Sequence, residues 1–341
     1  MAITKLIMAS VLLLTLSGCA TKGLIPMEAV AAGENQVQVV FEGEEPVWAG
    51  DAIAIMTELE QWRGLPFTND VRVSFQPRTD PRLNGWYNSE TKQLVVTTDG
   101  SSELGRGVLL HELFHALQDQ QFDLSALHAQ SLDQPDYDKA VTALIEGEAM
   151  LAVSELMNYD FLAHAQLPPE GPISEDFFEK VFLYGAGLKF VRAIREAGGW
   201  AAIDAVFQDP PRSTALIFQP ERYLAGERES EPIEVPLETG EILQSQTIQG
   251  EYELRLMLAK IPEFRTDLDQ ILDGYVSDTL GIIETPEGKI LHRWIIQFDQ
   301  VDTAIALPDK LKAALIDRVP EATPEVRPEV TDDQQTVTAE W

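Results

Sequence analysis

The stretch GRGVLLHELFHALQDQQFDL, residues 105–124, combines two histidines and a glutamate with a run of apolar residues. His111 and His115 lie four residues apart, and Glu112 directly follows the first histidine. Residues four apart share one face of a helix, so both imidazoles can point at one spot. Apolar residues on either side favour a helix that is buried beside a cleft. The stretch therefore predicts a metal site on a buried helix, with a pair of surface histidines as the alternative.

The pattern HELFH has the form HExxH, and each position suits zinc chemistry. Zinc binds imidazole nitrogens at about 2.0–2.1 Å in a tetrahedral arrangement, and this pair of histidines can supply two of the ligands. Glu112 lies about 100° around the helix from His111, which is poor for ligation but suitable for contact with a water on the metal. A general base occupies this position in zinc-dependent peptidases. The sequence predicts Zn2+ as the cofactor and Glu112 as the base.

A catalytic zinc needs a third protein ligand, and the stretch ALIEGEAM, residues 143–150, offers two. Glu146 and Glu148 are separated by about 200° on a helix, so only one of them can face the metal. The small residues Ala143 and Gly147 predict that this helix closely approaches the histidine helix. The residues alone leave the choice between the two glutamates open.

HELFH followed by a helix with EGEA resembles the gluzincin peptidases, the group of thermolysin and the zinc aminopeptidases. The third ligand of that family is a Glu in a segment of the type N-E-G-x-A, so the resemblance implies Glu146 as the ligand. Two departures stand out: Met150 replaces an Asp that many gluzincins have four residues after the Glu, and the spacing from His115 is longer.

A similar likeness to uncharacterised bacterial and archaeal zincin-like proteins covers most of the chain. It rests on residues 85–95, 111–124, 143–149 and 198–214, and continues more weakly to about residue 305. The likeness implies an α+β, zincin-like fold. This fold would have a small N-terminal sheet, the HExxH helix, a mainly helical C-terminal lobe and a small α+β appendage.

Two further residues are expected to support the site. Asp119 lies four residues after His115 and could orient that ligand by a hydrogen bond, with a solvent-facing side chain as the alternative. Hydrolysis also needs a group that stabilises the oxyanion. Related enzymes use a Tyr or His for this, and Tyr184 in FLYGAG is the candidate here, although a buried core tyrosine would look the same.

The N-terminus is expected to direct the protein to a membrane. The apolar run Leu6–Leu16 is too short to span a bilayer, and it leads into LSGC, residues 16–19. This resembles the lipobox of bacterial lipoproteins, in which Cys19 becomes the lipidated N-terminus. An ordinary secretory signal is the alternative. Because Ala20 follows, the resemblance implies a lipid-anchored protein of the cell envelope, in the outer membrane and facing the periplasm.

The net charge of the chain limits the kinds of partner that it can bind. The chain has 341 residues, with 25 Lys and Arg against 56 Asp and Glu, which gives a formal net charge of −31. Such a charge repels nucleic acid, so we expect no nucleic-acid partner. The oligomeric state cannot be read from the sequence.

The expected organisation has five parts. They are a signal peptide at 1–18, a linker at 19–45, the catalytic domain at 46–228, a small α+β unit at 229–318 and a disordered acidic tail at 319–341.

These features predict a membrane-tethered zinc metallopeptidase that hydrolyses a peptide or protein substrate. The strand Leu94–Thr97 is expected to form the edge of the cleft and to bind an extended peptide by strand addition. The alternative is a catalytically silent zincin-like lipoprotein that acts as a binding or assembly factor. The intact Glu112 favours the enzyme, because a purely structural zinc site has no use for a base.

Overall fold

The computed structural model describes residues 37–42, 49–77, 85–98, 105–331 and 335–341. Cys19 and the expected signal peptide lie outside this part of the chain. The chain forms two compact units. The first comprises Met1–Ala126 and Ala149–Tyr159, and the second comprises Leu127–Glu148 and Asp160–Trp341. One long helix, α4, contributes residues to both units.

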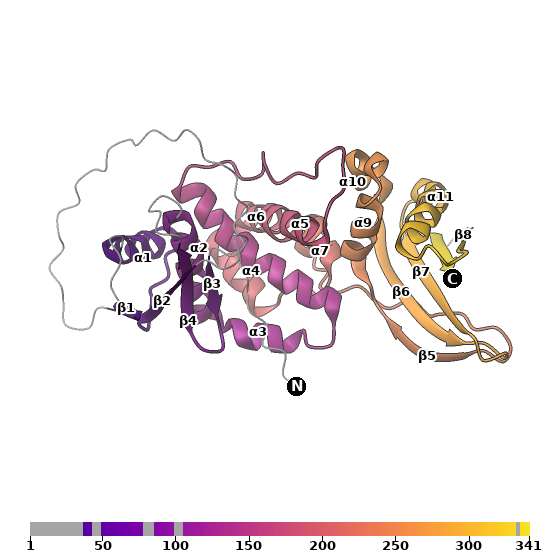
Figure 1. Cartoon of the computed structure of the whole chain (residues 1–341), viewed down its shortest axis with the longest axis horizontal. Helices are drawn as coiled ribbons and strands as arrows, with labels where there is room; N and C mark the ends of the chain where they lie inside the picture. The colour runs from indigo at the N-terminus through magenta and orange to yellow at the C-terminus, as the bar shows by residue number, and fades with distance from the viewer. Residues whose placement is uncertain (1–36, 43–48, 78–84, 99–104, 332–334) are drawn as a thin grey trace. The chain divides into compact units, whose positions relative to one another are not determined.

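The first unit is built on a mixed four-stranded sheet with the strand order β1-β2-β4-β3 (Figure 1). Strands β1, β2 and β4 run parallel, and β3 forms an antiparallel hairpin with β4. The elements are β1 (Val39–Glu42), α1 (Ala49–Arg63), β2 (Val71–Pro77), β3 (Gly85–Asn88), β4 (Gln93–Thr98) and α2 (Gly105–Phe122).

The core of this unit joins the sheet to α1 and α2. On β2, Val71 and Val73 are buried and the intervening Arg72 is exposed, which is the alternation of a half-buried strand. Ile55 and Leu59 lie four residues apart on α1 and are fully buried in the same core. Burial of each such side chain contributes about 1.5–3 kcal/mol.

Helix α2 is buried on every side over its central part. Twelve successive residues, from Val108 to Asp119, are buried. The predicted buried histidine helix is therefore confirmed. Polar groups at this depth need partners, because an unpaired buried polar group costs about 1–3 kcal/mol. The polar side chains of this stretch must therefore bond to one another, to neighbouring elements or to a ligand.

The first half of the second unit is helical. Its elements are α3 (Leu124–Gln130), α4 (Pro135–Leu156), α5 (Glu175–Lys180), the π-helix η1 (Val181–Ala186), α6 (Gly187–Gln208), α7 (Thr214–Phe218) and α8 (Pro220–Leu224). Helices α5, η1 and α6 follow one another without a break. Helix α6 has a kink at Gly198-Gly199, where Gly199 has a φ of +66°.

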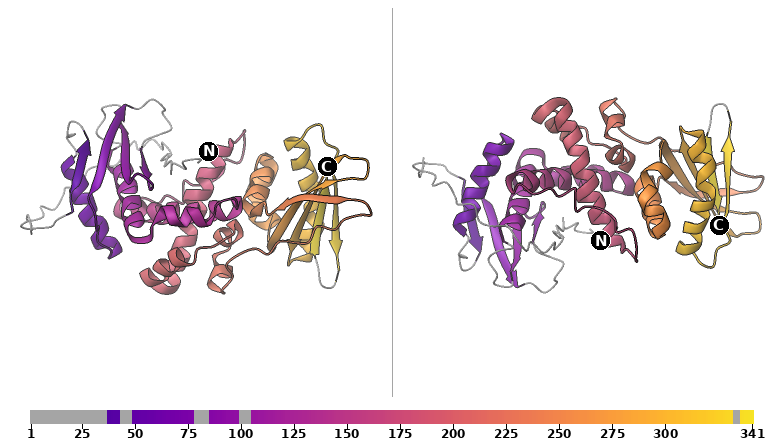
Figure 2. Two further views of the ribbon diagram at one scale, coloured as in Figure 1. Left: turned by 90° about the horizontal axis from the view of Figure 1, so that it is seen from below. Right: turned by 90° about the horizontal axis from the view of Figure 1, so that it is seen from above.

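The second half of this unit is an antiparallel five-stranded sheet with the order β5-β6-β7-β9-β8. Figure 2 shows α11 lying along this sheet, in contact with β8 and β9. The elements are β5 (Ile242–Thr247), α9 (Gly250–Ala259), the 3-10 helix η2 (Pro262–Asp267), α10 (Leu268–Ile271), β6 (Tyr275–Glu284), β7 (Ile290–Phe298), α11 (Val301–Arg318), β8 (Glu325–Val330) and β9 (Gln335–Glu340). The α+β class is thus confirmed.

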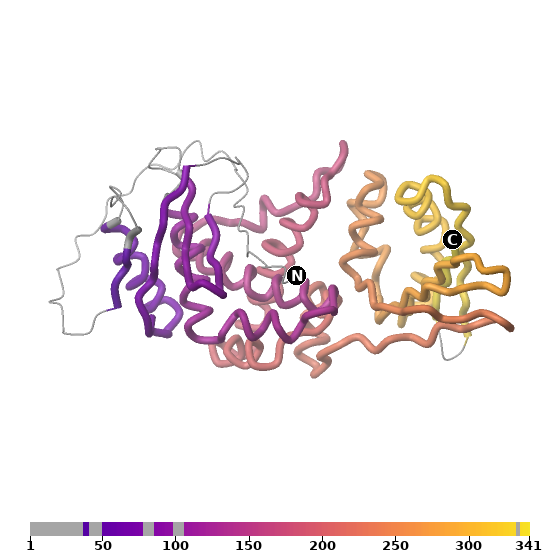
Figure 3. The backbone as a smooth tube through the Cα atoms, turned by 60° about the horizontal axis from the view of Figure 1, so that its bottom comes forward, coloured from indigo at the N-terminus to yellow at the C-terminus, as the bar shows by residue number. Residues whose placement is uncertain are grey.

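Two expectations about the ends of the chain were wrong. The supposed tail forms β8 and β9, and β9 pairs with both β7 and β8 inside the sheet. The supposed N-terminal linker contains β1, which pairs with β2. Residues 227–238 run extended between α8 and β5 (Figure 3), but they are bonded to β6: Ile233 donates its backbone N–H to Thr279, and Glu231 accepts from Ser277.

None of the helices in the described residues is long and apolar enough to cross a membrane.

Candidate metal centre

The two histidines of α2 converge as the spacing predicts. The Nε2 atoms of His111 and His115 lie 3.0 Å apart, and the two rings stand nearly perpendicular with centroids 4.5 Å apart. Both side chains are fully buried. Two imidazole nitrogens that point at one spot in the interior are the arrangement that a metal ion stabilises.

Helix α4 adds a carboxylate to this pair. One oxygen of Glu146 and one nitrogen of each histidine lie within 4.8 Å of one another, and all three residues are buried. In a tetrahedral zinc site the ligand atoms lie about 3.3 Å apart, so this cluster needs only a small contraction to hold the ion. Glu148 is fully buried but is not part of the cluster. The structure therefore favours Glu146 as the third ligand.

Two glycines set the position of α4. A Cβ atom on Gly147 would lie 2.3 Å from the backbone of Gly187 on α6, and one on Gly187 would lie 2.2 Å from the carbonyl oxygen of Ala143. The small residues of α4 thus permit a close approach to α6, whereas the sequence predicted an approach to α2. Because Gly147 faces α6, Glu146, about 100° around the helix, faces a different direction.

Gln118 orients one of the histidines, although the motif itself did not indicate it. Its Oε1 lies 2.8 Å from Nδ1 of His115, and both side chains are buried. An amide oxygen can only accept, so Nδ1 of His115 carries the proton and Nε2 offers its lone pair to a metal. Gln118 lies three residues after His115 on the same face of α2, which is the only sequence signal that could have indicated it.

Asp119, which we predicted in this role, bonds elsewhere. Its carboxylate accepts from the hydroxyl of Tyr87 at 2.7 Å, from Nζ of Lys92 and from the backbone N–H of Leu124. Burial and the Asp119 carboxylate raise the pKa of Tyr87, so this phenol stays protonated and donates. Asp119 therefore anchors the β3–β4 hairpin to α2, and His115 has a different partner.

Tyr184 and two further histidines lie in other elements of the fold. Tyr184 is buried in η1, and its ring meets that of Phe161 edge-on at 6.3 Å. Its role at the oxyanion stays a prediction. His128 lies 3.4 Å from Asp138, and His292 stacks on Trp341 within the second sheet.

Comparison of the chain with known protein families, with curated proteins and with solved structures found no match.

Proposed function

We propose that this protein is a zinc-dependent peptidase of the gluzincin type. The observation that supports this most strongly is the buried cluster of His111, His115 and Glu146, with Glu112 on the same buried turn of α2. Two neutral imidazoles and one carboxylate form a donor set suited to a zinc ion with one open position. A structural zinc site has four protein ligands, so a three-ligand set favours catalysis.

The residues of the cluster and Glu112 would have different roles in the hydrolysis of a peptide bond. A zinc ion held by the cluster would polarise the scissile carbonyl and lower the pKa of water. Glu112 would accept the proton of the attacking water and deliver it to the leaving amine. Its fully buried position keeps bulk water from competing for that proton.

The edge strand that could bind an extended peptide is β3. Strand β4, which contains the expected Leu94–Thr97, pairs with β2 on one side and with β3 on the other, so the expectation of an edge at Leu94–Thr97 was wrong. Within the described residues, β3 pairs only with β4. A Cβ atom on Gly85 of β3 would lie 3.2 Å from Cγ of Glu112, so β3 passes directly beside the catalytic turn. We propose that a peptide substrate adds to β3 there.

The proposed location is the bacterial cell envelope, with a lipid on Cys19 as the anchor in the outer membrane. The support is the apolar run that ends in LSGC. Labelling with a radioactive fatty acid tests this: label should enter the protein and be lost with Cys19→Ser. Label that is absent from the parent protein would contradict the anchor.

A substitution at Glu112 tests the proposed activity. Glu112→Gln keeps the size of the side chain and removes the base, so we expect hydrolysis of a peptide library to fall by at least about 100-fold. Bound zinc should stay at the parent level. Peptide cleavage that survives the substitution would contradict the mechanism. A parent protein that binds zinc and cleaves no peptide would favour the silent binding factor.

A further inference from the structure

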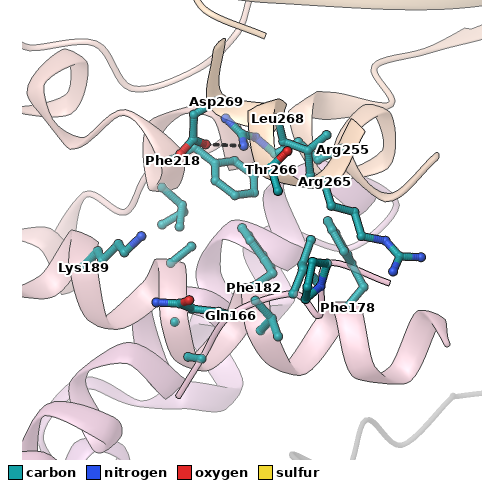
Figure 4. A pocket seen from close by; sticks show the side chains of 17 residues that line it. Gln166, Phe178, Phe182, Lys189, Phe218, Arg255, Arg265, Thr266, Leu268 and Asp269 are labelled. Atoms are coloured by element: carbon teal, nitrogen blue, oxygen red, sulfur yellow. Dashed lines mark hydrogen bonds and ion pairs between the residues drawn. The ribbon is translucent and has the colours of Figure 1, made fainter. Parts of the chain in front are cut away.

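A concave site lies within the second unit, and the residues of the proposed metal centre do not line it. It is a cavity of about 490 Å³ between the segment from α5 to α6, α7 and the segment from α9 to α10 (Figure 4). Pockets that bind small molecules have volumes of about 300–1,000 Å³ and are mostly apolar with a few polar groups. The cavity has the size expected of a ligand site.

Aromatic rings form the apolar wall of this cavity. The rings of Phe182 and Phe218 lie 5.0 Å apart at an angle of 43°, and Phe178 lies beside them (Figure 4). Aromatic groups prefer such tilted or edge-on contacts, which stabilise them beyond the burial of their area. A ligand with an aromatic body would find matching surfaces here.

The charges around the cavity are the reverse of those in the whole chain. Acidic residues outnumber basic ones by 56 to 25 in the sequence. The residues that line the cavity include three basic side chains, Lys189, Arg255 and Arg265, and one acidic side chain, Asp269. A local excess of positive charge in so acidic a protein favours an anionic ligand.

The three basic side chains differ in whether they can bind an anion in the cavity. Arg265 donates to the carbonyl oxygens of Ala259 and Pro168, and its guanidinium points away from the rings (Figure 4). Within the described residues, no acidic side chain pairs with Lys189, whose ammonium group points toward the side of the cavity where Phe218 lies (Figure 4). Lys189 can therefore accept an anion as it stands.

Arg255 provides the second contact. Its guanidinium lies over the ring of Phe218 at 4.2 Å and bonds to the buried Glu251 and to Asp269. The side chain of Asp269 is 92% exposed, so solvent screens its attraction to Arg255 and competes for its carboxylate. The carboxylate of a ligand can replace Asp269 at little cost.

We propose that this cavity binds a small aromatic carboxylate, with its ring against Phe182 and Phe218 and its carboxylate between Lys189 and Arg255. The carboxylate takes the place of Asp269 on Arg255. This binding site is separate from the proposed peptidase activity and requires no metal ion.

Two matched probes test the chemistry on the purified protein. N-acetylphenylalanine carries the aromatic ring and a carboxylate, and its amide carries the ring without the charge. Calorimetric titration should show the acid binding about tenfold more tightly than the amide, because two cations face the carboxylate. Equal binding of the two, or no binding of the acid at millimolar concentration, would overturn the proposal.

Two exposed side chains give variants with opposite expected effects. Lys189→Gln removes one contact, so the acid should bind about three- to fivefold more weakly. Asp269→Asn removes the competing carboxylate, so the acid should bind about threefold more tightly. Binding of the amide should change in neither variant. Unchanged binding of the acid in both variants would show that the anion lies elsewhere.

Discussion

At the scale of single residues, the buried polar side chains of α2 have separate tasks. His111 and His115 direct their Nε2 atoms at one spot, and Gln118 fixes the proton on the other nitrogen of His115. Asp119 instead anchors the β3–β4 hairpin. Glu112 lies on the same buried turn as the histidines, where the proposed mechanism places its base. A helix buried on all sides can carry this many polar groups because most of them bond to one another or to neighbouring elements.

Loss of Gln118 should weaken metal binding without removing a ligand. In Gln118→Ala, Nδ1 of His115 loses its acceptor, so the orientation and the tautomer of the ring are no longer fixed. The affinity for zinc should fall about 10- to 100-fold, measured by competition with a chelator of known affinity. Gln121→Ala is the matched control, because Gln121 lies on the same helix and bonds to Pro66. Equal losses in the two variants would show that Gln118 acts only through the stability of α2.

The sequence predicted that His111 and His115 converge, but not which side chain contacts His115. A spacing of four residues places two histidines on one face of any helix, so His111 and His115 could be identified from their spacing alone. Gln118 and Asp119 both lie within reach of His115 on a helix. Which of the two contacts His115 depends on Tyr87 and Lys92. These residues of the β3–β4 hairpin, distant in sequence, bond to the carboxylate of Asp119. Local spacing contains no information about such partners.

At the scale of secondary structure, the contact between α4 and α6 determines where Glu146 points. Gly147 and Gly187 bring the two backbones together so closely that no side chain fits between them.

The order of the strands in the first sheet could not be predicted from local sequence. The sequence predicted a strand at Leu94–Thr97, and this strand is β4. The order of the strands depends on distant pairing with β2, so β4 was mistaken for the edge.

A methyl group at the contact between the helices should displace α4. Gly147→Ala would place a Cβ atom 2.3 Å from the backbone of Gly187, so the free energy of unfolding should fall by at least about 2 kcal/mol. Gly50→Ala is the control, because Gly50 lies in α1 and a Cβ atom there would meet no other described atom within 4 Å. That control should change stability by no more than about 1 kcal/mol. Urea denaturation of both variants measures the difference, and equal effects would contradict the close contact.

At the scale of the whole molecule, carboxylates are buried in the interior of the second unit. Asp136 on α4 accepts from the hydroxyl and the backbone N–H of Thr214, and its second oxygen has no partner within the described residues. Asp278 on β6 accepts from Tyr275, Trp294 and the start of α9. Burial raises the pKa of Asp136 to about 7 and also raises the pKa of Asp278. The stability of this unit should therefore depend on pH.

Replacement of Asp136 should change that dependence. Between pH 3.8 and about 7 the native state keeps a proton on Asp136 that the unfolded state has released. This contribution favours folding at low pH and is lost as the pH rises through about 7. In Asp136→Asn the side chain cannot ionise, so the stability of the variant relative to the parent should rise by about 3 kcal/mol between pH 5 and pH 8. Urea denaturation at both pH values measures this, and a difference independent of pH would contradict it.

The composition of residues 319–341 led to the wrong prediction of a disordered tail, and the C-terminal sheet shows the reason. Strand β8 lies at the edge of the sheet and its residues are largely exposed, so its sequence is polar and contains Pro328. Strand β9 is central but short, and its buried face contains small residues such as Ala339. Both segments have the composition of a disordered chain. Pairing of β9 with β7 and β8, together with contacts of both strands with α11, gives these segments their structure.

The metal content of two matched variants tests the central claim most directly. Glu146→Ala and Glu148→Ala remove neighbouring buried carboxylates from the same helix, and only Glu146 belongs to the cluster with His111 and His115. Elemental analysis of the purified proteins should find about one zinc per chain in the parent and in Glu148→Ala. It should find almost none in Glu146→Ala. Absence of zinc from the parent after reconstitution, or equal loss from both variants, would contradict the proposed site.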